Sequence, residues 1–194
     1  RHTRYIGDWS SDVCSSDLHR LDRETSGCLL VAKKRSMLRS LQALFEKRVV
    51  QKQYWLLAKG LWQGPEVCTV KAPLRKNILT SGERMVCIDE QEGKPSETSF
   101  KLLENFAHAS TCWLLASPKT GRTHQIRVHA ASLGHPIIGD TKYGLRPQEK
   151  TRLYLHAQRI QFTLDGKSYV FEANWDASCD EKIQIFRLFK SRNT

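Results

Sequence analysis

The chain is divided into many short apolar segments by glycine, proline and asparagine. Apolar runs of this length, bounded by turn residues, are typical of β-strands. A chain with many strands and few helices is predicted to form an α+β fold, namely a mainly antiparallel mixed sheet with flanking helices. We expect helices over residues 36–47, 123–133 and 180–189, and strands over residues 27–33, 52–59, 66–70, 84–89, 98–104, 110–117, 153–155, 160–164 and 169–172.

The first two helical segments carry start and stop signals. Leu41 and Phe45 belong to an apolar stripe with helical spacing, and Ser36 stands where an N-cap is expected. Thr123 is the corresponding N-cap of the second segment, and Gly134 follows its last residue, as C′ glycines do.

The charge of the chain is strongly positive. Lys and Arg number 31 against 20 Asp and Glu, which gives a formal net charge of +11 over 194 residues. Residues 19–60 hold ten Lys or Arg and three Asp or Glu, a local balance of +7. A folded basic domain most often binds nucleic acid or another anionic surface. A basic protein whose charge serves only solubility is the alternative that composition leaves open.

Cysteine usage and hydropathy indicate a cytoplasmic protein. The six cysteines form no C-x-x-C pair, and Cys28, Cys87 and Cys112 lie inside apolar stretches. We therefore expect small buried apolar residues, not disulfides or zinc ligands. No apolar run reaches the roughly 20 residues of a membrane-spanning helix. The N-terminal residues also lack the apolar core of a signal peptide.

Residues 1–18 differ in character from the rest of the chain. Residues 8–18 are rich in Ser and Asp and have neither helical nor strand periodicity. The stretch resembles translated sequencing-adapter DNA, so we expect a segment foreign to the fold, with one domain over residues 19–194.

Residues 19–27, His-Arg-Leu-Asp-Arg-Glu-Thr-Ser-Gly, are the first candidate for chemistry. Asp22 stands between Arg20 and Arg23, and nearby positive charge favours the ionised form of a carboxylate. An ionised aspartate acts as a nucleophile or as a base. The two arginines can hold a polyanion beside it.

A second candidate segment spans residues 120–144. Gly121 permits a tight turn, and Arg127 projects from the first turns of the helix expected after it. A lone helical arginine is usually solvated or binds a phosphate, but paired with Asp22 it would set the ionisation and orientation of that carboxylate. Three histidines, at positions 124, 129 and 135, fit no common zinc spacing, so no metal site is expected.

Two further segments carry no chemical signal by themselves. Tyr54, in Lys52-Gln53-Tyr54, is either a cross-strand packing residue or, in a protein that handles bases, a ring that stacks on a nucleobase. Residues 153–157 are apolar enough to be simple core.

Five blocks together resemble the RluA family of pseudouridine synthases. Within this family, the likeness is to the C-type enzymes, which modify the RNA of the large ribosomal subunit. In the order of the family, they are residues 19–27, 52–54, 121–129, 134–144 and 155–157. Residues 72–98 add to the resemblance, which extends from residue 19 to residue 173.

The resemblance implies a pseudouridine synthase catalytic fold and the isomerisation of specific uridines in 23S ribosomal RNA, without a metal or other cofactor. Asp22 matches the essential catalytic residue, which either attacks ribose C1′ or removes the C2′ proton. Tyr54 matches the tyrosine that stacks on the target base, and Arg127 matches the arginine that pairs with the catalytic aspartate. Arg20 matches the residue that fills the gap left by the flipped base. Leu155 matches an apolar residue that packs on that base.

The remaining RNA contacts are expected from basic side chains and from the second candidate segment. Such phosphate contacts do not depend on sequence and weaken with salt. We expect large-subunit ribosomal RNA as the partner, no membrane association and a monomeric enzyme. The candidates are Arg23, Lys33, Lys34, Arg122 and His124.

The chain also departs from the family. Members of this type carry an S4-like RNA-binding domain and the first catalytic strands before the position of residue 19, so we expect an N-terminally truncated catalytic domain. Three alternatives are a synthase directed at tRNA, a non-catalytic RNA-binding fragment and a metal-dependent nuclease. The nuclease is disfavoured because no carboxylate cluster surrounds Asp22.

Overall fold

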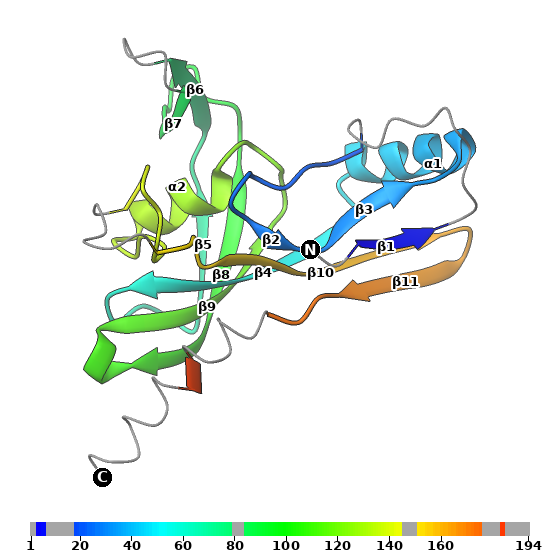
Figure 1. Ribbon diagram of the computed structural model, residues 1–194. Helices are drawn as coiled ribbons and strands as arrows, with labels where there is room; N and C mark the ends of the chain where they lie inside the picture. The colour runs from blue at the N-terminus through cyan, green and yellow to red at the C-terminus, as the bar shows by residue number, and fades with distance from the viewer. Residues whose placement is uncertain (1–2, 7–17, 79–83, 145–150, 176–182, 185–194) are drawn as a thin grey trace.

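The computed structural model describes residues 3–6, 18–78, 84–144, 151–175 and 183–184, and it confirms the α+β class (Figure 1). Its main sheet has seven strands in the order β11-β10-β4-β9-β8-β5, with β2 beside β10. Every neighbouring pair along that path is antiparallel, and β2 pairs with β10 in parallel. The strands are β2 (Ser26–Gly27), β4 (Gln51–Lys59), β5 (Val67–Lys71), β8 (Glu97–Phe106), β9 (Thr111–Pro118), β10 (Leu155–Leu164) and β11 (Lys167–Glu172).

The larger core lies on the central strands β4, β9 and β8. Leu56 and Leu57 are consecutive in β4 and both fully buried, so this strand is covered on both of its faces. Strand β9 alternates buried and partly buried residues, as expected where the two faces of a sheet differ in exposure. The short 3-10 helix η2 (Ala107–Ala109) turns β8 into β9.

A second core lies under helix α1 (Arg35–Glu46) and strand β3 (Leu29–Ala32). Leu41 is fully buried, and Met37, Leu38, Leu44 and Phe45 pack beside it, because the apolar residues recur at helical spacing. The stripe predicted from the sequence is thus confirmed.

Helix α2 (Gln125–Ser132) and a hairpin of β6 (Leu74–Ile78) and β7 (Arg84–Ile88) form the third part of the fold. Val128 of α2 packs with Leu74 and Val86 of the hairpin. In Figure 1 the hairpin and α1 both stand above the strands of the main sheet, at its two ends.

The helix starts differ from the expected ones. Helix α1 begins one residue earlier than expected, with Lys34 as its N-cap and no side-chain capping bond, so Ser36 is not the cap. The N-cap of α2 is His124, in the left-handed conformation with φ 53°, instead of Thr123. Gly134 does follow the helix with a positive φ of 79°. Tertiary contacts fix both starts, which the local sequence does not reveal.

The strand pattern differs in two places. Residues 155–164 form one long strand with a bulge between Ala157 and Arg159, where two short strands were expected. Strand β6 was not expected, because Leu74-Arg-Lys-Asn-Ile offers little apolar alternation. Of the helix expected over 180–189, only residues 183–184 lie within the described residues, and they are helical.

The four described cysteines are free thiols. Cys28 and Cys112 are buried as expected, whereas Cys68 is half-buried and Cys87 is exposed on the hairpin, where the strand has no core behind that face. Cys14 and Cys179 lie outside the described residues. In the described part of the chain, no helix has the length and apolar character needed to span a bilayer.

The boundary expected after residue 18 stays a prediction. Within residues 1–18, strand β1 (Thr3–Ile6) runs parallel to β3, and Leu18 is buried in the second core. Residues 7–17 lie outside the described residues.

Gly27 provides the test of the contact between β2 and β10. Its φ is 108°, and a Cβ there would overlap the carbonyl group of Ala157. We expect Gly27→Ala to lower the free energy of unfolding by about 3 kcal/mol, because strain and overlap add. Urea denaturation measures this loss.

Gly166 is the matched control for that measurement. It also has a positive φ, of 73°, but open space surrounds the position of its Cβ. Gly166→Ala should cost only the backbone strain, about 1 kcal/mol. Equal losses for the two variants would show that the close approach of β2 to β10 contributes nothing.

Candidate active site

The loop over residues 18–25 carries Asp22 and is fixed on both sides of it. The Nε2 atom of His19 accepts a hydrogen bond from the N–H of Leu30 at 2.8 Å, and its ring stacks on Phe45 of α1 with centroids 5.1 Å apart. After Asp22, the N–H of Thr25 donates to the Asp22 carbonyl at 3.0 Å. The half-buried Asp22 is therefore held in a fixed turn.

His19 serves this loop as a neutral side chain. Burial, together with the positive charge of Lys52, lowers the pKa of His19 to about 4. At neutral pH the Nε2 atom therefore has a free lone pair for the N–H of Leu30, and the ring proton resides on Nδ1.

The residues after the loop are fixed to β10. The imidazole of His156 donates from Nε2 to the Ala173 carbonyl at 2.9 Å, so its Nδ1 is left to accept from the Ser26 hydroxyl, also at 2.9 Å. Arg152 donates to the same hydroxyl oxygen at 3.2 Å. This network sets the end of the Asp22 loop relative to the main sheet.

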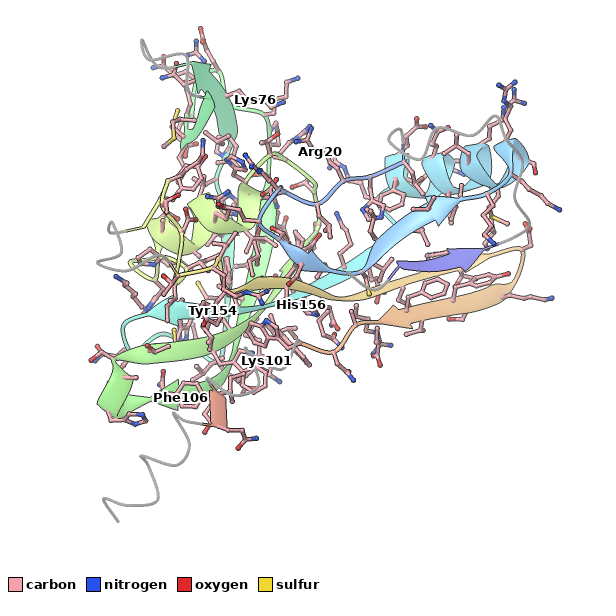
Figure 2. All side chains as sticks on the ribbon, viewed as in Figure 1. Arg20, Lys76, Lys101, Phe106, Tyr154 and His156 are labelled. Atoms are coloured by element: carbon pink, nitrogen blue, oxygen red, sulfur yellow. The ribbon has the colours of Figure 1, made fainter. Side chains whose placement is uncertain are left out.

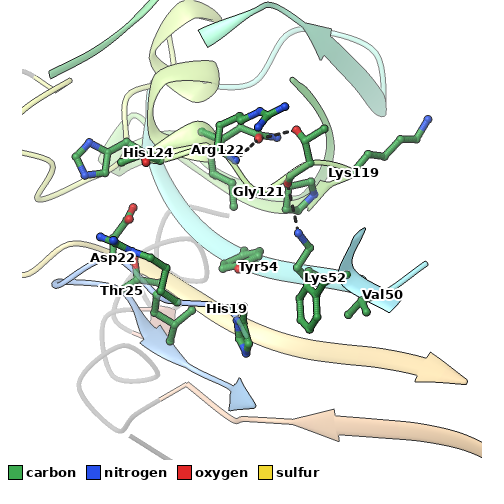
Figure 3. A pocket seen from close by; sticks show the side chains of 18 of the residues that line it. His19, Asp22, Thr25, Val50, Lys52, Tyr54, Lys119, Gly121, Arg122 and His124 are labelled. Atoms are coloured by element: carbon green, nitrogen blue, oxygen red, sulfur yellow. Dashed lines mark hydrogen bonds between the residues drawn. The ribbon is translucent and has the colours of Figure 1, made fainter. Parts of the chain in front are cut away.

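A pocket of about 410 Å³ lies between the Asp22 loop, α1, β4 and residues 118–127 (Figure 3). Asp22, Tyr54 and Arg127, which are far apart in the sequence, all line it. Figure 3 shows Asp22 and Tyr54 on the loop side and His124 and Arg122 on the opposite wall. The predicted site residues that line the pocket are Arg20, Asp22, Tyr54, Arg122, His124, Arg127 and Leu155.

Three predicted RNA-binding residues lie outside this lining. Arg23 and Lys34 are exposed and Lys33 is half-buried at the end of β3, so their contact with RNA stays a prediction. Figure 2 places Arg20 on the side of the sheet where the hairpin carries Lys76, and Lys101 on the other side. The positive side chains that line the pocket come from more than one element, as Arg20, Lys52 and Arg122 show.

Tyr54 presents an uncharged phenol to the pocket. Burial raises the pKa of Tyr54, and the negative charges of Asp22 and Cys28 raise it further. The phenol and the Asp22 carboxylate line the same pocket. Tyr54 pairs with Ala116 of β9 and Ala157 of β10, two small neighbours on the sheet.

Arg127 and Asp140 form a buried ion pair. The guanidinium donates from Nε and Nη2 to the two carboxylate oxygens at 2.8 and 2.7 Å, and the side chains are 3% and 0% exposed. Burial favours the neutral form of Asp140, but the hydrogen bonds and charge of Arg127 outweigh it and lower the pKa of Asp140. The pair is therefore ionised at both ends.

The ion pair expected between Arg127 and Asp22 is not formed in this structure. Asp140 instead accepts both hydrogen bonds from the Nε and Nη2 edge of the guanidinium. The spacing of residues in the sequence did not reveal this partner. Burial by itself would lower the pKa of Arg127, but Asp140 and, to a smaller extent, Asp22 raise it overall. Arg127 and Asp22 therefore line the same pocket without a hydrogen bond between them among the described residues.

His124 belongs to a chain of hydrogen bonds that reaches the hairpin. The N–H of Val86 donates to the Tyr143 hydroxyl at 3.0 Å, and that hydroxyl lies 2.7 Å from Nδ1 of His124. Burial lowers the pKa of His124, although the charge of Asp22 opposes this. A residue other than glycine with φ 53° is strained, and such strain concentrates at functional sites.

Sequence reasoning missed the residues that shape the wall over residues 118–127. The Gln125 amide oxygen accepts from the Thr120 hydroxyl at 2.7 Å and from the N–H of Arg122 at 3.0 Å. Its amide nitrogen donates to Glu97 and Thr98 of β8. The sequence offered no clear signal for this role, because Gln125 stands in a largely polar stretch after Thr123 and His124.

The donor set of the pocket offers no metal site. Within residues 18–78, 84–144 and 151–175, no three His, Cys, Asp or Glu side chains are grouped so that they would hold a metal ion.

Comparison with protein families gives one matching profile, described as RNA pseudouridylate synthase, over residues 16–132. Among curated proteins, "Ribosomal large subunit pseudouridine synthase C" of Salmonella typhimurium is 50% identical over 184 residues, covering 89% of this chain and 56% of its own length. The protein of the same name from Pasteurella multocida is 53% identical over 185 residues, covering 91% of this chain and 56% of its own length. The chain thus spans about half the length of these relatives.

Two human structures have a similar fold. "Human RNA Pseudouridylate Synthase Domain Containing 1" aligns with a TM-score of 0.71 and 31% identity, over 88% of this chain and 79% of its own. "Human RNA Pseudouridylate Synthase Domain Containing 4" aligns with a TM-score of 0.73 and 23% identity, over 88% and 75%, and this second likeness shows the fold alone.

Removal of the Asp140 charge tests the buried ion pair. Asp140→Ala leaves the Arg127 guanidinium buried without a partner, and we expect a loss of about 4 kcal/mol in the free energy of unfolding. Urea denaturation at pH 7.5 measures the loss.

An exposed ion pair supplies the control for Asp140. Glu172→Ala breaks the pair with Arg159, whose partners are 34% and 50% exposed. It should change stability little, because exposed pairs contribute little. If Asp140→Ala lowers the free energy of unfolding no more than Glu172→Ala does, the buried pair does not stabilise the fold.

The lowered pKa of His19 predicts a stability that depends on pH. A histidine that is neutral when folded contributes stability above its unfolded pKa of about 6.5. That contribution falls as the pH drops from 6.5 toward the folded pKa of about 4. At the lower limit the loss is about 3 kcal/mol.

The measurement is urea denaturation from pH 7.5 to pH 4.5. His19→Gln keeps a hydrogen-bond acceptor but does not titrate in this range. We expect its stability to fall less steeply with decreasing pH than that of the unchanged chain. Parallel curves for the two proteins would show that His19 is not the group responsible.

Proposed function

The chain belongs to the RNA pseudouridylate synthase family, and from this premise we propose that it isomerises uridine to pseudouridine in RNA. We propose large-subunit ribosomal RNA as the substrate, because the curated relatives with about half of their residues identical bear that substrate in their names.

One observation carries the proposal. Asp22, Tyr54 and Arg127 come from a loop, a strand and a helix, yet they line a single pocket of about 410 Å³. A protein that only binds RNA needs basic groups and stacking rings. It needs no half-buried carboxylate in the same pocket as a half-buried phenol and a buried guanidinium. The trio therefore supports a catalyst over a non-catalytic binding fragment.

Asp22 is the proposed catalytic group, and two routes are compatible with its position. In one, its carboxylate attacks C1′ of the ribose as the bond from C1′ to N1 of uracil breaks. In the other, it removes the C2′ proton as the same bond breaks, which gives a glycal. In both, the detached uracil carries the electron pair of the broken bond. The base then rotates and C5 bonds to C1′. In the first route the bond from Asp22 to C1′ breaks as this bond forms, and in the second route the proton returns to C2′. C5 then loses its proton and N1 takes one up, so that no atom is gained or lost overall.

The proposed roles of the other pocket residues follow from the cost of base flipping. Taking a uridine out of a stack costs a few kcal/mol, which an inserted side chain and a stacking surface offset. Arg20, exposed at the pocket rim, is placed to fill the gap in the RNA. The ring of Tyr54 and the side chain of Leu155 offer surfaces for the flipped base. His124 and Arg122 are proposed RNA contacts on the opposite wall.

The remaining features of the proposal rest on the family resemblance and on charge. We propose that the enzyme needs neither a metal nor a cofactor and acts as a monomer in the cytoplasm. The net charge of +11 supports phosphate binding that does not depend on sequence, to which Arg23, Lys33 and Lys34 contribute.

Asp22→Asn tests the proposed function. It keeps the shape of the side chain but removes its charge and basicity, so we expect pseudouridine formation to fall at least about a thousandfold. The RNA dissociation constant should change less than about threefold, because RNA binding relies on basic groups. Carbodiimide labelling and primer extension on a transcript of large-subunit ribosomal RNA measure the product.

Glu24→Gln is the matched control, because Glu24 is an exposed carboxylate two residues away in the same loop. It should leave the rate unchanged. Modification by the Asp22→Asn variant at a tenth or more of the normal rate would overturn the assignment. If the unchanged, folded chain bound the transcript but produced no pseudouridine, the proposal of a catalyst would fall.

A further inference from the structure

Lys52 is a half-buried cation on the wall of the candidate active site. It lies two residues before Tyr54 in β4, so the two side chains project from the same face of the strand. Both line the pocket, as Figure 3 shows, and Lys52 points toward the segment at Thr120 and Gly121. The ammonium group is therefore at the pocket wall beside the surface proposed for the base.

The ammonium group has few partners in the protein. Its Nζ donates one hydrogen bond, to the Thr120 carbonyl at 3.3 Å. Asp22 and Glu46 also line the pocket, but neither forms an ion pair with Lys52. Burial lowers the pKa of Lys52, and no carboxylate offsets that effect. An ammonium group offers three donors, so two of them have no acceptor among the described residues.

Two other cations of the pocket are neutralised by carboxylates. Arg127 is paired with Asp140, and Lys119 at the rim is paired with Glu97. Of these three, Lys52 alone has no carboxylate partner. A partly buried cation without a counter-charge is costly unless a ligand supplies one. The cost would be offset when a negatively charged group enters the pocket.

We propose that the Lys52 ammonium binds a negatively charged oxygen of the nucleotide that occupies the pocket. Two sources share this chemistry, namely a phosphate oxygen of the RNA and an oxygen of the uracil that has just left the ribose. The second source depends on the proposed function, because only bond cleavage makes the uracil an anion. The first source depends on RNA binding alone.

Lys52→Met tests the proposal, since methionine keeps the apolar stem and removes the charge. RNA affinity is measured as a function of salt, and pseudouridine formation as a single-turnover rate at saturating transcript. A lost phosphate contact weakens affinity about tenfold and reduces the slope of log K against log salt by about one. A lost contact to the uracil oxygen leaves affinity unchanged and slows the single-turnover rate about a hundredfold.

Two further measurements separate binding from a structural role. The melting temperature of Lys52→Met should be equal to or higher than that of the unchanged chain, because an uncompensated buried charge has been removed. If Lys52 were only structural, the melting temperature would fall. Lys101→Met is the matched control, because Lys101 is 49% exposed on β8 and lies outside the pocket. It should change neither affinity nor rate by as much as Lys52→Met does.

The result that overturns the proposal is a folded Lys52→Met protein whose affinity, salt slope and rate all equal those of the unchanged chain. That outcome is distinct from failure of the proposed function, in which the unchanged chain itself forms no pseudouridine. In that case the affinity measurement still decides, because unchanged RNA affinity and salt slope in Lys52→Met would exclude the phosphate contact as well.

Discussion

The buried ion pair of Arg127 and Asp140 is the interaction on which the candidate site depends most. It ties the first turn of α2 to residues 137–144, and Asp140 also accepts the backbone N–H groups of Lys142 and Tyr143 at 2.9 and 3.0 Å. Tyr143 lies under the Arg127 guanidinium, whose carbon is 5.1 Å from the ring centroid. The same tyrosine contacts His124, so the ion pair is linked to the His124 end of the wall opposite Asp22.

Around Asp22 the protein uses burial to keep polar side chains neutral. His19, Tyr54 and His124 each have a pKa shifted toward the uncharged form, and burial is the first cause in every case. Neutral groups can donate or accept a hydrogen bond without competing with Asp22 for counter-charge. The two cations differ in their partners, because Arg127 is paired with Asp140 whereas Lys52 donates only to the Thr120 carbonyl.

The fold explains how distant segments converge on this pocket. Strand β4 lies between β9 and β10 and so places Tyr54 at the centre of the sheet. Strand β2 pairs with β10 only because Gly27 allows close approach to Ala157, and this brings the Asp22 loop beside β4. Helix α2 starts in a strained turn held by Gln125, which directs Arg127 inward. The pocket is thus assembled by sheet order and not by proximity in the chain.

The sequence by itself determined the α+β class, most strands and the apolar stripe of α1. The resemblance of its blocks to a known family singled out Asp22, Tyr54 and Arg127 as candidates, which the structure brings to one pocket. Periodicity follows from the local backbone, and the blocks are contiguous residues, so both are readable without a structure. The sequence did not reveal the helix caps, the single long strand β10 or the hairpin strand β6. It also did not reveal that Arg127 pairs with Asp140 or that Lys52 is unpaired. Those features are set by contacts between residues far apart in the chain, where burial and electrostatics outweigh local preference. Only the tertiary structure decides which charges meet.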